Sequence, residues 1–268
     1  MFGARKRRRE KLRNQPFPPG WLKIIGQNVP IYCRLSEADQ KELQGHIHVF
    51  LAEKNFEGCG GLDLTDEIKV TIAAYACILL LHRRTDYYPG LFSILVYPDA
   101  FIAKAHVSLA PGFYAETQQV HLGESWKRGA LILSWNHVLA SAVEHRNGHN
   151  VVLHEFAHQL DTENGYANGA PPLPQRSMYE AWARILAKDY AQLQRDADEG
   201  RSTVLDKYGA TDPAEFFAVA TESFFENPVR LQMENPELYE ELKLYFRQDP
   251  ANMFPPAQNL PCRSMPTE

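Results

Sequence analysis

The sequence predicts an α+β fold that is mostly helical and contains one small mixed or antiparallel sheet. Apolar residues recur at helical spacing near both ends of the chain, whereas strand-like runs gather between residues 92 and 135. With 44% hydrophobic and 23% charged residues, the 268-residue chain has the composition of an ordinary globular protein. The length would accommodate one substantial domain or two small ones, and we expect a single domain over residues 16–250.

The N-terminal segment is strongly basic. Residues 1–13 contain seven arginine or lysine residues against Glu10 alone, while the whole chain has a net charge of −5. No apolar stretch follows this run, so it is not a signal peptide. It could contact anionic lipid or nucleic acid, but we expect a disordered basic tail over residues 1–15. Because the rest of the chain is acidic, we expect no direct nucleic-acid binding by the folded part.

Hydropathy and cysteine spacing indicate the cellular compartment of the protein. The longest apolar stretch, residues 70–81, is too short to cross a bilayer, so no transmembrane segment is expected. The cysteines form no Cys-x-x-Cys pair, so neither a thiolate zinc cluster nor a disulfide framework is indicated. They stand at Cys33, Cys59, Cys77 and Cys262. We therefore expect a cytoplasmic protein.

Two helices are expected in the first third of the chain. Ser36 is a candidate N-cap for a helix that ends near Lys54. Thr65 begins a second helix that reaches about Arg83, and its nearly continuous apolar character predicts that protein surrounds it.

Strand-like runs follow at residues 92–97, 120–122 and 130–135. A sheet just before the next helix could bind a peptide, because an edge strand can pair with an extended peptide. Residues 131–135 are the candidate for that edge.

The segment over residues 152–161, Val-Leu-His-Glu-Phe-Ala-His-Gln-Leu-Asp, is the centre of the prediction. On a helix, His154 and His158 lie four positions apart on one face, so two imidazoles can bind a single ion. Glu155 lies beside them, and in the zinc-peptidase arrangement this glutamate is the base that takes a proton from water. Asn150 is a plausible N-cap. A separate apolar face, which would pack into the core, comprises Val152, Phe156, Ala157 and Leu160.

His-Glu-x-x-His also arises by chance, in roughly a few per cent of chains of this size, as two solvated surface histidines. Here the motif falls inside an apolar-periodic helix and acidic residues follow it, so we predict a zinc site. His137, His145 and His149 have no partner at metal-binding spacing and are expected to be loop or packing residues. Asp161 either accepts a hydrogen bond from a metal-binding histidine or is a helix-end carboxylate without a role.

Three helices are predicted after the motif. Ser177 and Glu180 form a candidate capping box at the start of the first. Asp-Pro at 212–213 and Asn-Pro at 235–236 place proline at the first position of the other two. Residues 251–268 are proline-rich, and we expect an extended C-terminal tail.

A catalytic zinc ion takes three protein ligands and keeps one position for water. No histidine or aspartate follows His158 at the spacing that metzincins use, so the third ligand should come from another helix. Glu215 and Glu222 lie seven residues apart and so on one helical face, and either could reach the ion. Glu215 is also the third residue after Asp212, where a capping box would give it a purely local role.

Three stretches together resemble a known family. His-Glu-Phe-Ala-His at 154–158, Tyr208, and Asp-Pro-Ala-Glu-Phe-Phe-Ala at 212–218 are similar to the Mlc titration factor A family of bacterial zinc peptidases. They are more distantly similar to the catalytic domain of anthrax lethal factor, where a tyrosine stands seven residues before Glu-Phe-Phe-Ala. The similarity covers residues 21–250 and leaves out both tails. It implies a zincin-like, gluzincin-type domain with the sheet beside the active-site helix.

The resemblance also implies roles for individual residues. His154, His158 and Glu215 would bind Zn²⁺, Glu155 would be the general base, and the Tyr208 hydroxyl would steady the tetrahedral intermediate.

By the same resemblance Glu222 would support a metal ligand or have a structural role. The implied activity is hydrolysis of small peptides by an aminopeptidase that also binds the glucose-responsive repressor Mlc. The alternative is a protein without enzymatic activity that sequesters the repressor and so controls sugar phosphotransferase genes.

Overall fold

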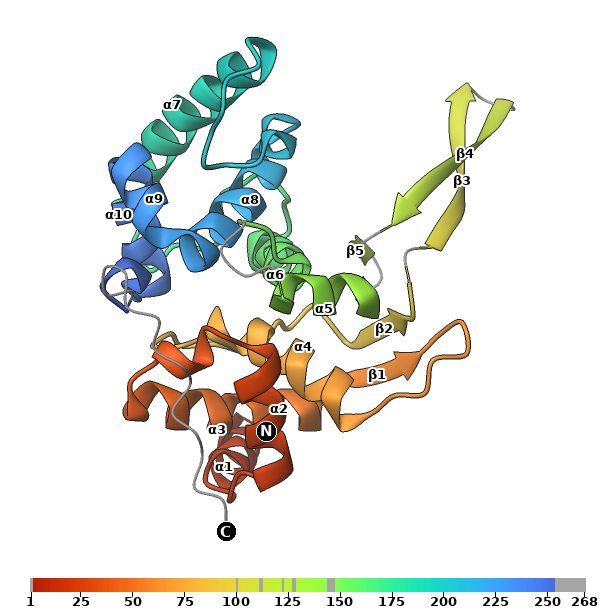
Figure 1. Cartoon of the computed structure of the whole chain (residues 1–268), viewed down its shortest axis with the longest axis vertical. Helices are drawn as coiled ribbons and strands as arrows, with labels where there is room; N and C mark the ends of the chain where they lie inside the picture. The colour runs from red at the N-terminus through yellow and green to blue at the C-terminus, as the bar shows by residue number, and fades with distance from the viewer. Residues whose placement is uncertain are drawn as a thin grey trace.

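The computed structural model has the predicted class, with helices forming most of the chain beside one small mixed sheet (Figure 1). The structure describes residues 2–99, 101–110, 113–121, 123–126, 129–143 and 148–253. Apart from its first three residues, the expected extended tail over 251–268 lies outside the described residues, as does His145.

The helices are α1 (Phe2–Arg13), α2 (Pro19–Asn28), α3 (Glu37–Glu53), α4 (Asp66–Ile78), α5 (Trp135–Val143), α6 (Val151–Asp161), α7 (Met178–Asp198), α8 (Pro213–Glu226), α9 (Pro228–Glu234) and α10 (Pro236–Phe246). Short 3-10 turns lie at Tyr32–Arg34, Thr162–Asn164, Lys207–Ala210 and Pro250–Met253. The strands are β1 (Asn55–Gly58), β2 (Ser93–Tyr97), β3 (Phe101–Ala110), β4 (Phe113–His121), β5 (Gly123–Trp126) and β6 (Ala130–Ser134).

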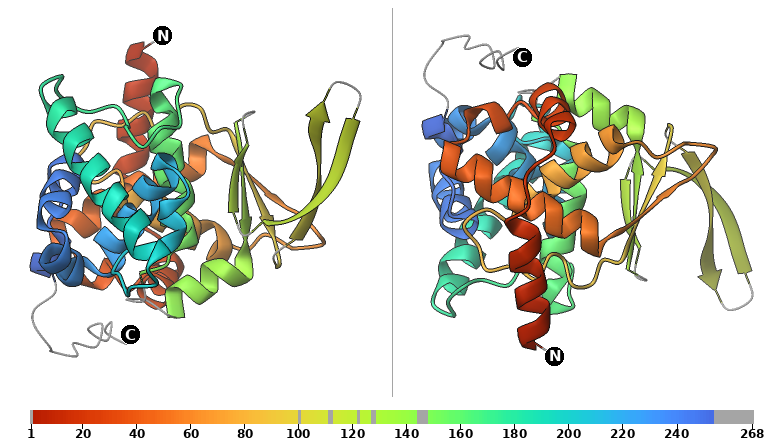
Figure 2. Two further views of the ribbon diagram at one scale, coloured as in Figure 1. Left: turned by 90° about the horizontal axis from the view of Figure 1, so that it is seen from above. Right: turned by 90° about the horizontal axis from the view of Figure 1, so that it is seen from below.

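The four-stranded sheet has the order β1-β2-β6-β5, in which the first three strands are parallel and β5 is antiparallel to β6. Strands β3 and β4 form a separate antiparallel hairpin that projects from the side of the helical body (Figure 2). The expectation that residues 131–135 form the sheet edge is wrong, because β6 pairs on both sides. Its side chains from 131 to 134 are all buried, which is typical of a central strand. Strand β5 occupies this edge and contacts α6.

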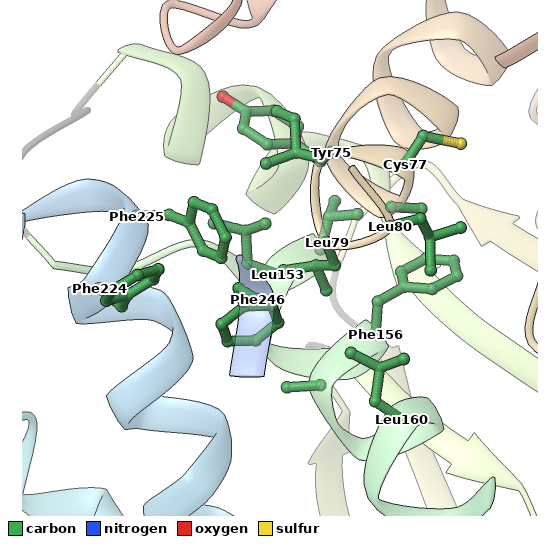
Figure 3. Packing of buried hydrophobic residues seen from close by; sticks show 14 of the residues in the cluster. Tyr75, Cys77, Leu79, Leu80, Leu153, Phe156, Leu160, Phe224, Phe225 and Phe246 are labelled. Atoms are coloured by element: carbon green, nitrogen blue, oxygen red, sulfur yellow. The ribbon is translucent and has the colours of Figure 1, made fainter. Parts of the chain in front are cut away.

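Helix α6 lies in the middle of the molecule and contacts α4, α5 and α8 (Figure 1). Its predicted apolar face is confirmed, since Val152, Phe156, Ala157 and Leu160 are all buried. Figure 3 shows side chains of α6 packed between Leu79 and Leu80, which follow α4, and the phenyl rings of α8. Residues that precede α6 in the sequence and residues that follow it therefore both pack against this helix and fix its position.

Replacing Phe156 by alanine is expected to lower the free energy of unfolding by about 3–5 kcal/mol, because the fully buried ring would leave a cavity. The ring packs edge-on against Phe50 and Tyr88, with centroid separations of 5.7 and 4.8 Å. Urea denaturation measures the loss. Met233→Ala is the control, because Met233 is 75% exposed. Equal, small changes in both variants would contradict this packing account.

The N-terminal residues 2–13 form helix α1 instead of the expected disordered tail. The Arg9 guanidinium lies 2.7 Å from the Glu53 carboxylate and 2.6 Å from that of Asp86. Arg13 donates a hydrogen bond to the Tyr87 hydroxyl at 2.7 Å. The expectation failed because it considered only the charge within the segment, whereas these partners come from α3 and from the segment after α4.

The predicted starts of α3 and α4 are confirmed, as is the predicted end of α3, but the predicted end of α4 is wrong. Ser36 and Thr65 cap α3 and α4 as expected, each accepting a hydrogen bond from a backbone N–H three residues later. Helix α4 ends at Ile78, five residues before the expected end at Arg83. The capping box at Ser177 is wrong, because that residue has helical backbone angles and its side chain makes no capping hydrogen bond.

The cysteines depart from the expectation at one position. Cys33 is disulfide-bonded, whereas Cys59 and Cys77 are free. Within the described ranges, no helix combines the length and apolar character needed to cross a bilayer.

Candidate metal centre

Helix α6 presents His154 and His158 on one face, as their four-residue spacing predicts. Their Nε2 atoms are 3.2 Å apart. Helix α8 adds Glu215, whose Oε2 lies 3.0 Å from His154 Nε2 and 3.4 Å from His158 Nε2. The structure therefore brings together the three residues that were predicted to bind a metal ion.

The start of α8 places Glu215 in this position. Asp212 caps the helix by accepting hydrogen bonds from the N–H groups of Ala214 and Glu215, and Pro213 occupies the first helical position. The cap therefore uses the backbone of Glu215 and leaves its carboxylate free to point at the histidines. Of the two glutamates left open by spacing alone, Glu215 is the one beside both Nε2 atoms.

Glu222 contacts the His154 ring on the side away from Glu215 and His158. Its Oε1 accepts a hydrogen bond from His154 Nδ1 at 2.7 Å, and its Oε2 accepts one from the Asn150 N–H at 2.5 Å. Because a carboxylate can only accept, His154 carries a proton on Nδ1, and this hydrogen bond directs Nε2 toward Glu215 and His158. Glu222 thus fixes both the tautomer and the direction of the ring.

Asn150 has a second function that the sequence did not reveal. Its side chain caps α6 by accepting from the Leu153 N–H, as predicted, and it also donates to Glu226 Oε1 at 2.8 Å. Glu226 is four residues after Glu222 and so lies on the same face of α8. That repeat of buried glutamates along one face is the sequence signal that could have identified this network.

Glu155, the predicted general base, is buried beside the two histidines. The side chain is almost fully buried at 5% exposure, and its Oε2 makes no hydrogen bond within the described residues. Burial raises the pKa of Glu155 to about 7, and the nearby histidines His154 and His158 oppose that rise. A buried carboxylate beside the two histidines, with one oxygen that makes no hydrogen bond in the described part of the chain, is suited to accept a proton.

Tyr208 lies at the rim of the site. Its ring centroid is 6.2 Å from that of His154, and the residue is 56% exposed. Partial burial raises the pKa of the Tyr208 hydroxyl, and the carboxylates of Glu215 and Glu155 raise it further. The hydroxyl therefore keeps its proton at neutral pH and can act as a hydrogen-bond donor.

Asp161 does not accept from a metal-binding histidine in this structure. The residue is fully buried, and its Oδ2 accepts a hydrogen bond from the Gly169 N–H at 2.8 Å. Gly169 has a φ of +73°, and a Cβ there would lie 2.3 Å from the Pro213 carbonyl oxygen. Asp161 therefore ties the end of α6 to a loop that abuts the start of α8. The expected support of a histidine comes from Glu222 instead.

The donor atoms fit a metal ion. Ligand atoms about 2.0–2.2 Å from a tetrahedral zinc ion stand about 3.3–3.5 Å apart, close to the 3.0–3.4 Å separations seen here. Glu215 Oε2 is buried and accepts no hydrogen bond of good geometry, although both rings are within reach. Burial alone would raise the pKa of Glu215, but His154 and His158 outweigh it and lower the pKa to about 2. An anionic oxygen that converges with two imidazole nitrogens is a ligand set suited to a divalent cation.

Among the histidines that the structure describes, only His154 and His158 belong to this group. His137 Nδ1 lies 2.8 Å from Ser134 Oγ, and His149 Nε2 lies 3.2 Å from Asp206, as expected for packing or loop residues. Asp39, Glu42 and His82 also come together. Both ring nitrogens of His82 are already 3.2 Å from carboxylate oxygens, so ion pairing accounts for that arrangement.

A mostly helical domain whose central helix carries His-Glu-x-x-His, with a glutamate from a second helix beside both histidines, is a metallopeptidase-like domain. Comparison with protein families agrees, because the glucose-regulated metallopeptidase M90 family matches residues 4–247. The chain belongs to this family. The match begins within α1, so the family includes the segment that was expected to be a divergent tail.

Two relatives illustrate the similarity. An uncharacterized protein of Synechocystis sp. is 43% identical over 245 residues, which are 91% of this chain and 89% of that protein. Mlc titration factor A of Yersinia pestis is 32% identical over 228 residues, which are 83% of each chain. The family resemblance seen in the sequence is confirmed.

Proposed function

We propose that this protein is a zinc-dependent peptidase. The observation that supports the proposal is the convergence of His154 Nε2, His158 Nε2 and Glu215 Oε2. These three atoms would hold the ion and leave its fourth position for water or substrate. When bound, zinc would supply Lewis acidity, which makes water nucleophilic near neutral pH and polarises a peptide carbonyl.

The remaining chemistry is assigned to side chains of this chain. Glu155 accepts the proton of the attacking water and can return it to the leaving amine. Tyr208 donates a hydrogen bond to the oxygen on which negative charge develops. Strand β5, at the edge of the sheet and in contact with α6, is available for pairing with an extended peptide. Aminopeptidase specificity for small peptides is implied only by the family resemblance.

The test is hydrolysis of a panel of aminoacyl and blocked peptide substrates by purified protein. We expect cleavage of substrates with a free amino terminus, loss of cleavage with the chelator ortho-phenanthroline, and recovery on adding Zn²⁺. The meta isomer, which does not chelate, is the control. Cleavage that survives chelation, or no cleavage of any substrate by the zinc-loaded protein, would contradict the proposal.

Replacing Glu222 by glutamine is expected to weaken zinc binding about 10- to 100-fold. An amide cannot accept from both His154 Nδ1 and the Asn150 N–H as a carboxylate does, so the ring loses its fixed direction. Competition with a zinc-sensitive dye measures the affinity. Because the change is isosteric, circular dichroism should show an intact fold. Unchanged zinc affinity would remove Glu222 from the metal centre.

We also propose that the protein binds a repressor of the Mlc type, because relatives that share 32% identity carry the name Mlc titration factor A. Both roles would place the protein in the cytoplasm. Surface-immobilised repressor should capture the wild-type chain and the Glu155→Gln variant equally if binding does not depend on catalysis. No capture of either form would overturn this second role.

A further inference from the structure

A basic cavity lies between α1 and the segment that follows α4. It is partly open to solvent, and its volume of about 700 Å³ is within the range of small-molecule sites. Six of its ten lining side chains are basic and two, Glu10 and Asp86, are acidic. The basic residues are Arg5, Lys6, Arg9, Arg13, Arg83 and Arg84. The folded part of the chain is otherwise acidic, so this concentration of positive charge is local.

Part of this charge is already used to hold α1 in place. Arg5 and Arg9 both pair with Glu53 and Asp86. In contrast, Lys6 and Arg84 have no hydrogen bond or ion pair with any residue that the structure describes. They face the same cavity from two segments far apart in the sequence. Two positive charges are therefore available to a ligand, with Glu10 as the opposing charge on the wall.

The wall of the cavity is held rigidly. Tyr87, which lines it, and Tyr88 both have positive φ angles, of 57° and 55°. This conformation is uncommon for bulky residues and persists only where the surroundings enforce it. The Tyr88 hydroxyl donates to the Ala76 carbonyl at 2.6 Å, and its ring packs against Phe156. A strained segment beside a cavity is a frequent feature of ligand sites.

From the unpaired charge, the volume and the fixed wall, we propose that this cavity binds a small anion carrying two or more phosphate-type charges. Guanidinium groups bind phosphate oxygens in a bidentate manner, and a lysine adds a point charge. A nucleic acid fits less well, because the basic groups converge on one hollow rather than follow an extended face. The proposal does not depend on peptidase activity.

Isothermal titration with inorganic pyrophosphate at low salt tests the proposal on the full chain. We expect wild type to bind one equivalent and Lys6→Ala/Arg84→Ala to bind about tenfold more weakly or worse. The control is Arg7→Ala/Lys11→Ala, which also removes two positive charges in total, both at residues of α1 that do not line the cavity. It should bind as wild type does. Both variants keep Arg9 and Arg13, which hold α1.

Further ligands identify the source of the phosphate group. A hexose monophosphate and ADP, titrated in the same way, should compete with pyrophosphate, and their order of affinity shows which class the cavity prefers. No binding of pyrophosphate by wild type, or equal weakening in both double variants, would overturn the proposal. Duplex DNA that binds more tightly than pyrophosphate, with equal loss in both variants, would also overturn it in favour of a nucleic-acid surface.

Discussion

Replacing Glu155 by glutamine is expected to reduce peptide hydrolysis by a factor of about 100 to 10,000 while zinc remains bound. Glutamine has nearly the same shape but cannot accept the proton of the attacking water. The wild-type carboxylate is suited to this task because it is 5% exposed and its Oε2 makes no hydrogen bond among the described residues. Since Glu155 is not one of the three converging residues, metal content should stay at the wild-type level.

The measurement is kcat on the best substrate of the peptide panel, with zinc content determined on the same samples. Glu180→Gln is the matched control, because Glu180 is an exposed glutamate on α7, away from the metal centre. It should hydrolyse at the wild-type rate. A Glu155→Gln variant that is fully loaded with zinc and as active as wild type would end the proposed mechanism.

Replacing Glu215 by alanine is expected to remove both zinc binding and hydrolysis. The change deletes the oxygen that lies 3.0 and 3.4 Å from the two Nε2 atoms and leaves only two imidazoles to hold the ion. The loss of zinc affinity should exceed that caused by Glu222→Gln, because Glu222 contacts only one of the three proposed ligands, His154. Helix α8 should still form, since its cap uses the Asp212 side chain.

Zinc titration with a competing dye and the peptide assay measure the two effects. Glu240→Ala, on an exposed face of α10, controls for the loss of one negative charge and should behave as wild type. Retention of tight zinc binding by Glu215→Ala would mean that another residue supplies the third ligand.

Local rules predicted the parts of the site that lie within one helix. The spacing of His154 and His158 placed them on one face, and Asn150 and Asp212 cap α6 and α8 as expected. Local rules could not decide whether Glu215 or Glu222 is the third ligand. Both lie on the same side of α8, so periodicity alone could not separate them, and only the packing of α8 on α6 gives each its distance from the rings.

The predictions that failed depend on contacts that each segment makes with residues outside it. The basic residues of α1 are held by Glu53 and Asp86, which a count of local charge does not include. Residues 131–135 were mistaken for an edge because strand β5, which precedes β6 by a short connection and pairs with it, was not predicted. Asp161 binds the Gly169 N–H for the same kind of reason, since the loop after α6 returns to it.

The most direct test of the metal centre is anomalous diffraction at the zinc edge from crystals of the zinc-loaded protein. We expect one peak about 2.0–2.2 Å from His154 Nε2, His158 Nε2 and a Glu215 carboxylate oxygen. A Glu215 side chain turned away from both rings, with no other residue in its place, would contradict the account.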